Sequence, residues 1–183
     1  DANIAIGGGA AEANSSGTRN IAIGHDAYTA SDTENDNLAI GYQAMTTNTA
    51  GGTKLLAIGN YALDAATSGD KNIGVGYAAL GAVTSGSENV AVGDNALSLV
   101  TTTNGNTAVG AQAGEAVVGA SNTAVGQYAL KAATTTNDNT AVGASSLTAN
   151  TGGASNTAVG SGSLAANTTG ASNIAVGSSA LVA

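Results

Sequence analysis

Apolar and polar positions recur along the whole chain in a fixed order. A pentapeptide, Asn-x-Ala-(Ile/Val)-Gly, is followed by an Ala or Ser, usually a Leu, and then a run of Thr, Ser, Asn and Gly. Large and small side chains alternate within the pentapeptide, which is the period-two pattern of a β-strand. A helix is not expected, because Gly and β-branched residues recur without a 3.6-residue spacing.

The repeat has a period of 17 residues. Ten copies begin with Asn and one with Leu, and consecutive copies start 17 residues apart except for one step of 18 and one of 16. This regularity leaves no room for a second domain, so residues 1–183 are predicted to form a single repeat domain, which we interpret as a fragment of a longer fibre protein. The copies open at Asn3, Asn20, Asn37, Leu55, Asn72, Asn89, Asn106, Asn122, Asn139, Asn156 and Asn173.

Each unit is predicted to form one coil of a parallel β-solenoid. A strand, a Gly bend, a second short strand and a polar turn complete the coil, and successive coils stack about 4.8 Å apart. The predicted fold class is therefore all-β. About eleven coils of this kind make a rod on the order of 50 Å long.

Equivalent residues of stacked coils are expected to form ladders. Asn at position one would bond the turn backbone and the next Asn, and Gly at position five would make a bend that a side chain obstructs. Ile or Val at position four, the residue at position two and Leu at position nine are expected to fill the interior. The small residues at positions three and eight are expected to face outward. Representative ladder members are Asn20, Asn89 and Asn156, then Ile23, Val92 and Val159, then Gly24, Gly93 and Gly160.

A single roll of this kind has a thin core. Burial of each apolar side chain contributes about 1.5–3 kcal/mol, whereas ordering the backbone costs about 1–2 kcal/mol per residue. The expected outward stripe of Ala and Ser would allow another roll to approach closely. We therefore predict a homo-oligomer and favour three chains side by side around an axis.

The pentapeptide also resembles a known structural repeat. Asn20–Gly24 and its copies are similar to the repeat of the YadA-type head domain of trimeric autotransporter adhesins, and the longer unit that opens at Asn156 resembles phage-type tail-fibre shafts. The resemblance covers essentially all 183 residues. It implies a left-handed parallel β-roll, a homotrimer and an extracellular location, on a virion tail fibre or a bacterial cell surface.

The expected function is mechanical and not enzymatic. The chain is predicted to be a shaft or head segment of a phage-type tail fibre that supports host attachment, with a host receptor or glycan bound through flanking domains. The alternative is a bacterial surface adhesin that binds host cells or matrix. A polysaccharide-degrading fibre is disfavoured because the acidic residues are scattered. An ice-binding solenoid is disfavoured because its Thr column is expected to face inward; the column consists of Thr107, Thr123, Thr140 and Thr157.

The amino-acid composition excludes or disfavours several classes of binding partner. Four Lys plus Arg against twelve Asp plus Glu give a net charge of −8, which disfavours nucleic acid and anionic lipid surfaces. The absence of Cys excludes disulfides and zinc–thiolate sites. No apolar run approaches the roughly 20 residues that span a bilayer, so membrane insertion of this segment is not expected. No cofactor is predicted.

Few residues indicate chemistry, and no catalytic residue is predicted. Asp32, Glu34 and Asp36 alternate in one turn and are weak candidates for a hard cation such as Ca²⁺; the alternative is a solvated acidic corner. The single His25 lies beside Asp26 in a bend and is interpreted as a surface residue.

Four tyrosines follow the Gly bend and are candidate surface or interchain contacts. Their rings could stack on a sugar or contact a receptor, or they could pack between neighbouring chains. We favour packing between chains because the tyrosines form no continuous aromatic track in the sequence. They are Tyr42 and Tyr77 at position six, and Tyr61 and Tyr128 at position seven.

Overall fold

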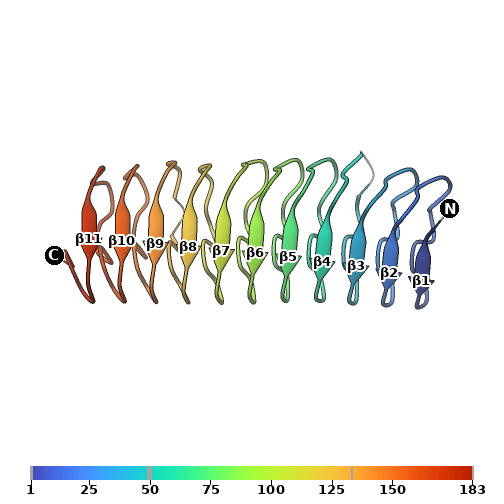
Figure 1. Ribbon diagram of the computed structural model, residues 1–183, viewed down its shortest axis with the longest axis horizontal. Coiled ribbons are helices and arrows are strands. Elements are labelled where there is room, and N and C mark those ends of the chain that lie inside the picture. Colours follow the sequence, from blue (N-terminus) through green and yellow to red (C-terminus); the bar gives the residue numbers. More distant parts are fainter. Residues whose placement is uncertain (1, 49–50, 133, 183) are drawn as a thin grey trace.

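The computed structural model describes residues 2–48, 51–132 and 134–182, and these ranges form a rod of stacked coils. Each coil contributes one three-residue strand, and every strand pairs in parallel with the next along the chain, so that the termini lie at opposite ends (Figure 1). The described ranges contain no helix. The predicted all-β parallel solenoid with about 17 residues per coil is confirmed. The strands are β1 (Ile4–Ile6), β2 (Ile21–Ile23), β3 (Leu38–Ile40), β4 (Leu56–Ile58), β5 (Ile73–Val75), β6 (Val90–Val92), β7 (Thr107–Val109), β8 (Thr123–Val125), β9 (Thr140–Val142), β10 (Thr157–Val159) and β11 (Ile174–Val176).

Equivalent residues of consecutive coils are paired in register, even where the repeat changes length. Leu38 pairs with Leu56 across the 18-residue step, and Thr107 pairs with Thr123 across the 16-residue step. The extra and missing residues are therefore absorbed outside the sheet. Part of the longer unit, residues 49–50, lies outside the described ranges.

The strand faces point the opposite way from the prediction. Ala at position three is buried, whereas the side chains at positions two and four lie on the outer face. Ile23, Val92 and Val159 are therefore not core residues; Val92 and Val159 are each 37% exposed, and Ile23 is half-buried. The small residues at position eight, such as Ala62 and Ala79, are buried too. The predicted outward stripe of small side chains lies inside the coil.

Lack of space inside the coil explains this orientation. At Gly74, which replaces the usual Ala, an added Cβ would lie 2.9 Å from the carbonyl oxygen of Ala79 and 3.4 Å from Cγ of Leu63. A β-branched side chain at position three would therefore overpack the interior. The space is filled from the opposite wall by Leu at position nine, as predicted. Leu63, Leu80, Leu97, Leu130 and Leu147 are fully or almost fully buried.

The segment after the Gly bend is not the predicted second strand. Positions seven and nine adopt left-handed backbone conformations, with φ of 60° at Tyr61 and 52° at Leu63. An extended strand cannot contain such residues at alternate positions. The segment still bonds to its neighbours: the amide of Leu63 donates to the carbonyl of Ala79, and the amide of Leu80 donates to that of Ala96, both at 3.0 Å. Each coil thus has one strand and a series of hydrogen-bonded turns.

Asn at position one forms the predicted ladder. The backbone amide of Asn106 donates to Oδ1 of Asn89 at 2.9 Å, and Nδ2 of Asn89 donates to the carbonyl oxygen of Thr103 at 2.8 Å. Asn20 and Asn156 make the same two kinds of bond. The ladder side chains are almost completely buried, so these bonds satisfy backbone groups that water does not reach.

Gly at position five forms a second ladder, which has no room for side chains. Gly24, Gly93 and Gly160 have φ between 130° and 135°. A Cβ at Gly93 would lie 2.6 Å from the carbonyl carbon and oxygen of Gly110 in the next coil. The backbone conformation and the close stacking both require glycine here, as the sequence predicts.

Candidate functional site

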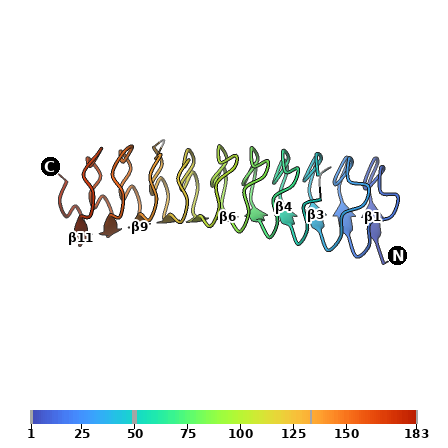
Figure 2. The ribbon, with the colours of Figure 1, turned by 90° about the horizontal axis from the view of Figure 1, so that it is seen from above.

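The outer face of the sheet is apolar along the rod. Position four is Ile in β1–β4 and Val in β5–β11, and position two is Ile, Leu or Val in β1–β6. The strands lie along one side of the rod (Figure 2). Because they pair in register, the side chains at positions two and four form two parallel columns. Solvent reaches the columns even in the middle of the rod, where Val109 is 39% exposed.

The same face becomes more polar toward the C-terminal half. Position two is Thr in four successive strands, β7–β10, and these residues pair in register. They share the outward orientation of every position-two side chain and are half-buried. The expectation that this column faces inward is therefore wrong. As for the Ile and Val residues, the interior of the coil has no space for a β-branched side chain from the strand. The column consists of Thr107, Thr123, Thr140 and Thr157.

An aromatic track crosses four coils beside the sheet. Ring centroids are separated by 5.8 Å from His25 to Tyr42, by 5.5 Å from Tyr42 to Tyr61 and by 5.6 Å from Tyr61 to Tyr77. Nδ1 of His25 also lies 3.0 Å from a carboxylate oxygen of Asp26. The interpretation that these tyrosines form no continuous track is thus wrong. Positions six and seven of adjacent coils lie close enough in space for their rings to meet.

Tyr128 lies apart from this track and contacts a lysine. Nζ of Lys131 is 4.8 Å from the Tyr128 ring centroid, a cation–π distance. The same ammonium donates to Oε1 of Gln112 at 2.6 Å and lies 3.5 Å from Oε2 of Glu115. One amine is therefore held by an aromatic ring, an amide and a carboxylate.

The fifth tyrosine, Tyr28, is a core residue. It takes the place of Leu at position nine, and its hydroxyl accepts a hydrogen bond from Nδ2 of Asn37 at 2.7 Å. Burial raises the pKa of the Tyr28 hydroxyl above its usual value. Its role is structural.

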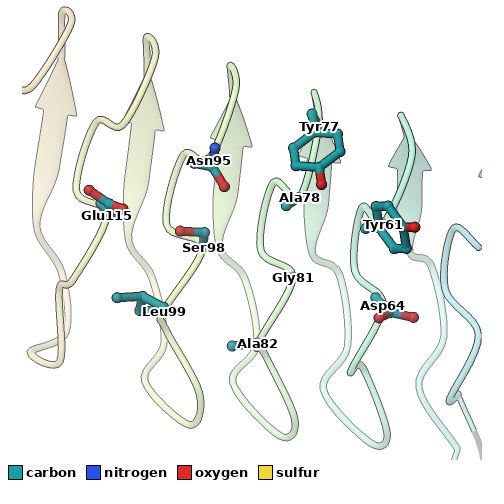
Figure 3. A pocket seen from close by; sticks show the side chains of 10 residues that line it. All are labelled: Tyr61, Asp64, Tyr77, Ala78, Gly81, Ala82, Asn95, Ser98, Leu99 and Glu115. Carbon is teal, nitrogen blue, oxygen red and sulfur yellow. The ribbon is translucent and has the colours of Figure 1, made fainter.

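A groove of about 440 Å³ lies at the end of the aromatic track (Figure 3). Tyr61 and Tyr77 line one end and Glu115 the other. The fifth coil forms the floor because it carries Gly81 at position ten, where the adjacent coils carry Asp64 and Ser98. Sequence reasoning missed this groove, although the Gly at position ten of the fifth unit, between Asp64 and Ser98 of the adjacent units, was the available signal.

The three acidic candidates do not converge on one point. Asp36 pairs with Arg19, whose Nη2 lies 2.9 Å from the Asp36 carboxylate, and this hydrogen bond holds the pKa of Asp36 below its usual range. The Glu34 carboxylate is buried and accepts hydrogen bonds from the backbone amides of Asp32 and Gly51, both at 3.1 Å. Within residues 2–48, 51–132 and 134–182, no group of three acidic or histidine side chains is arranged to hold a metal ion.

Comparisons of the chain with protein-family models, with curated proteins and with solved structures find no match. In the part of the chain that the structure describes, no helix is long and apolar enough to cross a membrane. The functional argument therefore depends on the surfaces described above.

Proposed function

We propose that the chain is a shaft or head segment of an extracellular homotrimeric fibre, most simply a phage-type tail fibre. The observation that supports this proposal is the outward apolar face of the sheet. Two columns of β-branched and Leu side chains run along the rod, whereas soluble monomers rarely expose large contiguous apolar patches. Three copies that turn this face toward a common axis would bury it. The number three comes from the resemblance to the YadA-type repeat.

The proposed role is mechanical. The ladder of backbone and Asn hydrogen bonds runs along the rod axis, so bending the rod would distort bonds at many coils together. A rod of this kind would hold a flanking domain at a distance from the particle or cell that carries it. Flanking domains would then contact a host receptor or glycan. A bacterial surface adhesin would use the same rod in the same way.

The oligomeric mass in solution tests this proposal. Light scattering coupled to size-exclusion chromatography should give about three times the 17.2 kDa chain mass. The trimer should persist on dilution, because an interface that follows the strand face along the whole rod is large. A folded species with the mass of one chain at every concentration would refute the proposal.

A charged substitution on the apolar face gives a second test. Val109→Glu should fold, because this side chain is 39% exposed in the single chain, but it would place an uncompensated charge in the trimer interface. We expect a single-chain mass for this variant. The matched control is Ala144→Glu, which adds the same charge at exposed position six and should remain trimeric. Dissociation of both variants would argue against the strand face as the interface.

Ice binding is a second candidate, which the orientation of the Thr column favours. A flat column of Thr beside a column of Val presents hydroxyl and methyl groups at a regular spacing of about 4.8 Å along the rod. Ice binding needs this face to be open, whereas the trimer buries it. Thermal hysteresis that is lost in Thr123→Leu, together with a single-chain mass, would therefore favour this candidate over the fibre.

A further inference from the structure

The groove at the end of the aromatic track runs along the rod and not around it. Its lining residues come from four consecutive coils and include none from the strands. Three steps of about 4.8 Å between coils give a length on the order of 14 Å. An extended peptide of about four residues has this length. The groove can therefore accommodate an extended chain on a side of the rod distinct from the apolar face.

One end of the groove is aromatic. The track ends at Tyr77, whose side chain is 54% exposed, and the next coil has Asp94 at the same position. Tyr61 meets Tyr77 at an interplanar angle of 77°, so the two rings stand nearly perpendicular to each other. A ligand can thus contact the Tyr77 ring on the side that faces the next coil, where no aromatic residue packs against it.

The groove is most acidic near its aromatic end. Asp64 lies beside the tyrosines and Asp94 lies next to the lining residue Asn95. Glu115 closes the far end, where its Oε2 lies 3.5 Å from Nζ of Lys131. Lys and Arg are not found among the groove-lining residues. The field of Asp64 also acts on Tyr61, whose pKa is raised mainly by burial and further by Tyr42, Tyr77 and this carboxylate. The charge of the site therefore favours a cation.

The protein itself shows how such a cation would be held. Tyr128 and Lys131 occupy positions seven and ten of their coil, and the ammonium lies over the ring, near an amide and a carboxylate. Tyr61 and Asp64 occupy the same two positions four coils earlier. Asp64 thus stands where the internal cation stands in the other coil. Position ten of the Tyr61 coil therefore supplies a carboxylate and not an ammonium. The Asp64 carboxylate can attract a cation from another molecule.

We propose that this groove binds the Arg or Lys side chains of an extended basic peptide segment. One cation contacts the Tyr77 ring and Asp64, and a second, about four residues along the peptide, shares the Glu115 carboxylate with Lys131. Leu99, which is 57% exposed in the groove, contacts the aliphatic part of these side chains. The peptide belongs to the surface that the rod meets. This inference is independent of the trimer, because the groove and the strand face use different residues.

A binding titration with two matched peptides tests the proposal. The probes are capped Arg-Ala-Arg-Ala-Arg and capped Gln-Ala-Gln-Ala-Gln, added to the full chain at physiological salt and followed by calorimetry and by NMR of the tyrosine ring protons. Alternate residues of an extended peptide project to the same side, so all three Arg side chains can face the groove. We expect the Arg peptide to bind at least about fivefold more tightly, because two cation–aromatic or cation–carboxylate contacts are lost with Gln.

Substitutions separate the groove from the overall negative charge. Tyr77→Ser should weaken binding of the Arg peptide about two- to fivefold, whereas Tyr77→Phe, which keeps the ring, should not. Asp64→Asn should weaken it about twofold. The control is Glu12→Gln, which removes the same charge at an exposed position three coils before Asp64, outside the groove and roughly 14 Å along the rod. At physiological salt that charge is screened, so this variant should bind like the original chain.

Three outcomes would overturn the proposal. Equal weakening by Asp64→Asn and Glu12→Gln would mean that the peptide responds only to net charge. Equal binding of the Arg and Gln peptides would mean that the groove does not recognise cations. Binding of maltotriose, with loss of that binding in Tyr77→Ser and no binding of the Arg peptide, would mean that the groove is a neutral saccharide site.

Discussion

Replacement of Gly93 by Ala tests the physical basis of the rod at a single position. Gly93 has φ of +134°, a region that is essentially restricted to glycine. The new Cβ would also lie 2.6 Å from the carbonyl carbon and oxygen of Gly110, which are backbone atoms and cannot move without disturbing the next coil. The substitution therefore combines backbone strain with steric overlap between coils.

The two contributions can be separated by matched glycines in the same chain. Gly105 has a left-handed φ of +68°, but the nearest atom to its added Cβ is Oγ of Ser121 at 3.8 Å. Gly152 is an exposed glycine outside the left-handed region, and its added Cβ would meet only a methyl group of Thr169, at 3.5 Å. Gly105→Ala therefore measures the cost of backbone strain without steric overlap. Gly152→Ala introduces neither strain nor overlap and serves as the reference.

Strain of about 1–3 kcal/mol and overpacking of about 1–3 kcal/mol together predict a loss of about 2–6 kcal/mol for Gly93→Ala. Gly105→Ala should cost about 1–2 kcal/mol, the usual penalty of a left-handed residue with a Cβ. Gly152→Ala should be neutral or stabilising by about 0.4–1 kcal/mol, since it restricts the unfolded chain.

Urea unfolding followed by circular dichroism gives the free energy of unfolding for all three variants. The slope of the transition should be unchanged, because the surface exposed on unfolding is the same. If Gly93→Ala lost no more stability than Gly152→Ala, the glycine ladder would not be in close contact, and the stacking described here would be wrong.

Three further predictions concern the ladder, the core and an exposed ion pair. Asn89→Ala should destabilise the chain by about 2–4 kcal/mol in urea unfolding, because it leaves the buried amide of Asn106 and the half-buried carbonyl of Thr103 without partners; near-neutral behaviour would contradict the ladder. Tyr28→Phe should cost about 1 kcal/mol through the loss of a buried hydrogen bond, whereas Tyr77→Phe at the exposed track should change stability little. In NMR titration the Asp36 carboxylate should protonate below the usual Asp range and return toward it in Arg19→Gln. The ion pair therefore contributes at pH above the usual Asp pKa and is lost as the pH falls through the lowered value; an unchanged midpoint in Arg19→Gln would contradict the pairing.

The repeat made much of the fold predictable. The 17-residue period, with Asn at position one and Gly at position five, predicts parallel coils and two backbone-related ladders, and both ladders are present. Leu80 and its equivalents are buried as predicted. These features depend on local hydrogen bonding and backbone conformation. Both follow from which residue occupies each position of the repeat.

Candidate surfaces were less predictable, because they arise from contacts between units. The aromatic rings of Tyr42, Tyr61 and Tyr77 occupy two different positions of the repeat, and only the stacking of coils brings them together. The groove depends on Gly81 being smaller than Asp64 and Ser98, which occupy the same position in the adjacent coils. Neither feature is visible within one repeat.

The repeat pattern predicts that the chain forms a parallel solenoid and that position three faces opposite to positions two and four. Which of these faces lies inside depends on how the folded coil packs. Alternation fixes relative directions along a strand, whereas the side that is buried depends on the space left by the opposite wall of the coil. With Leu63 and its equivalents filling that space, only Ala or Gly fits beneath the strand, and the Ile and Val side chains face outward.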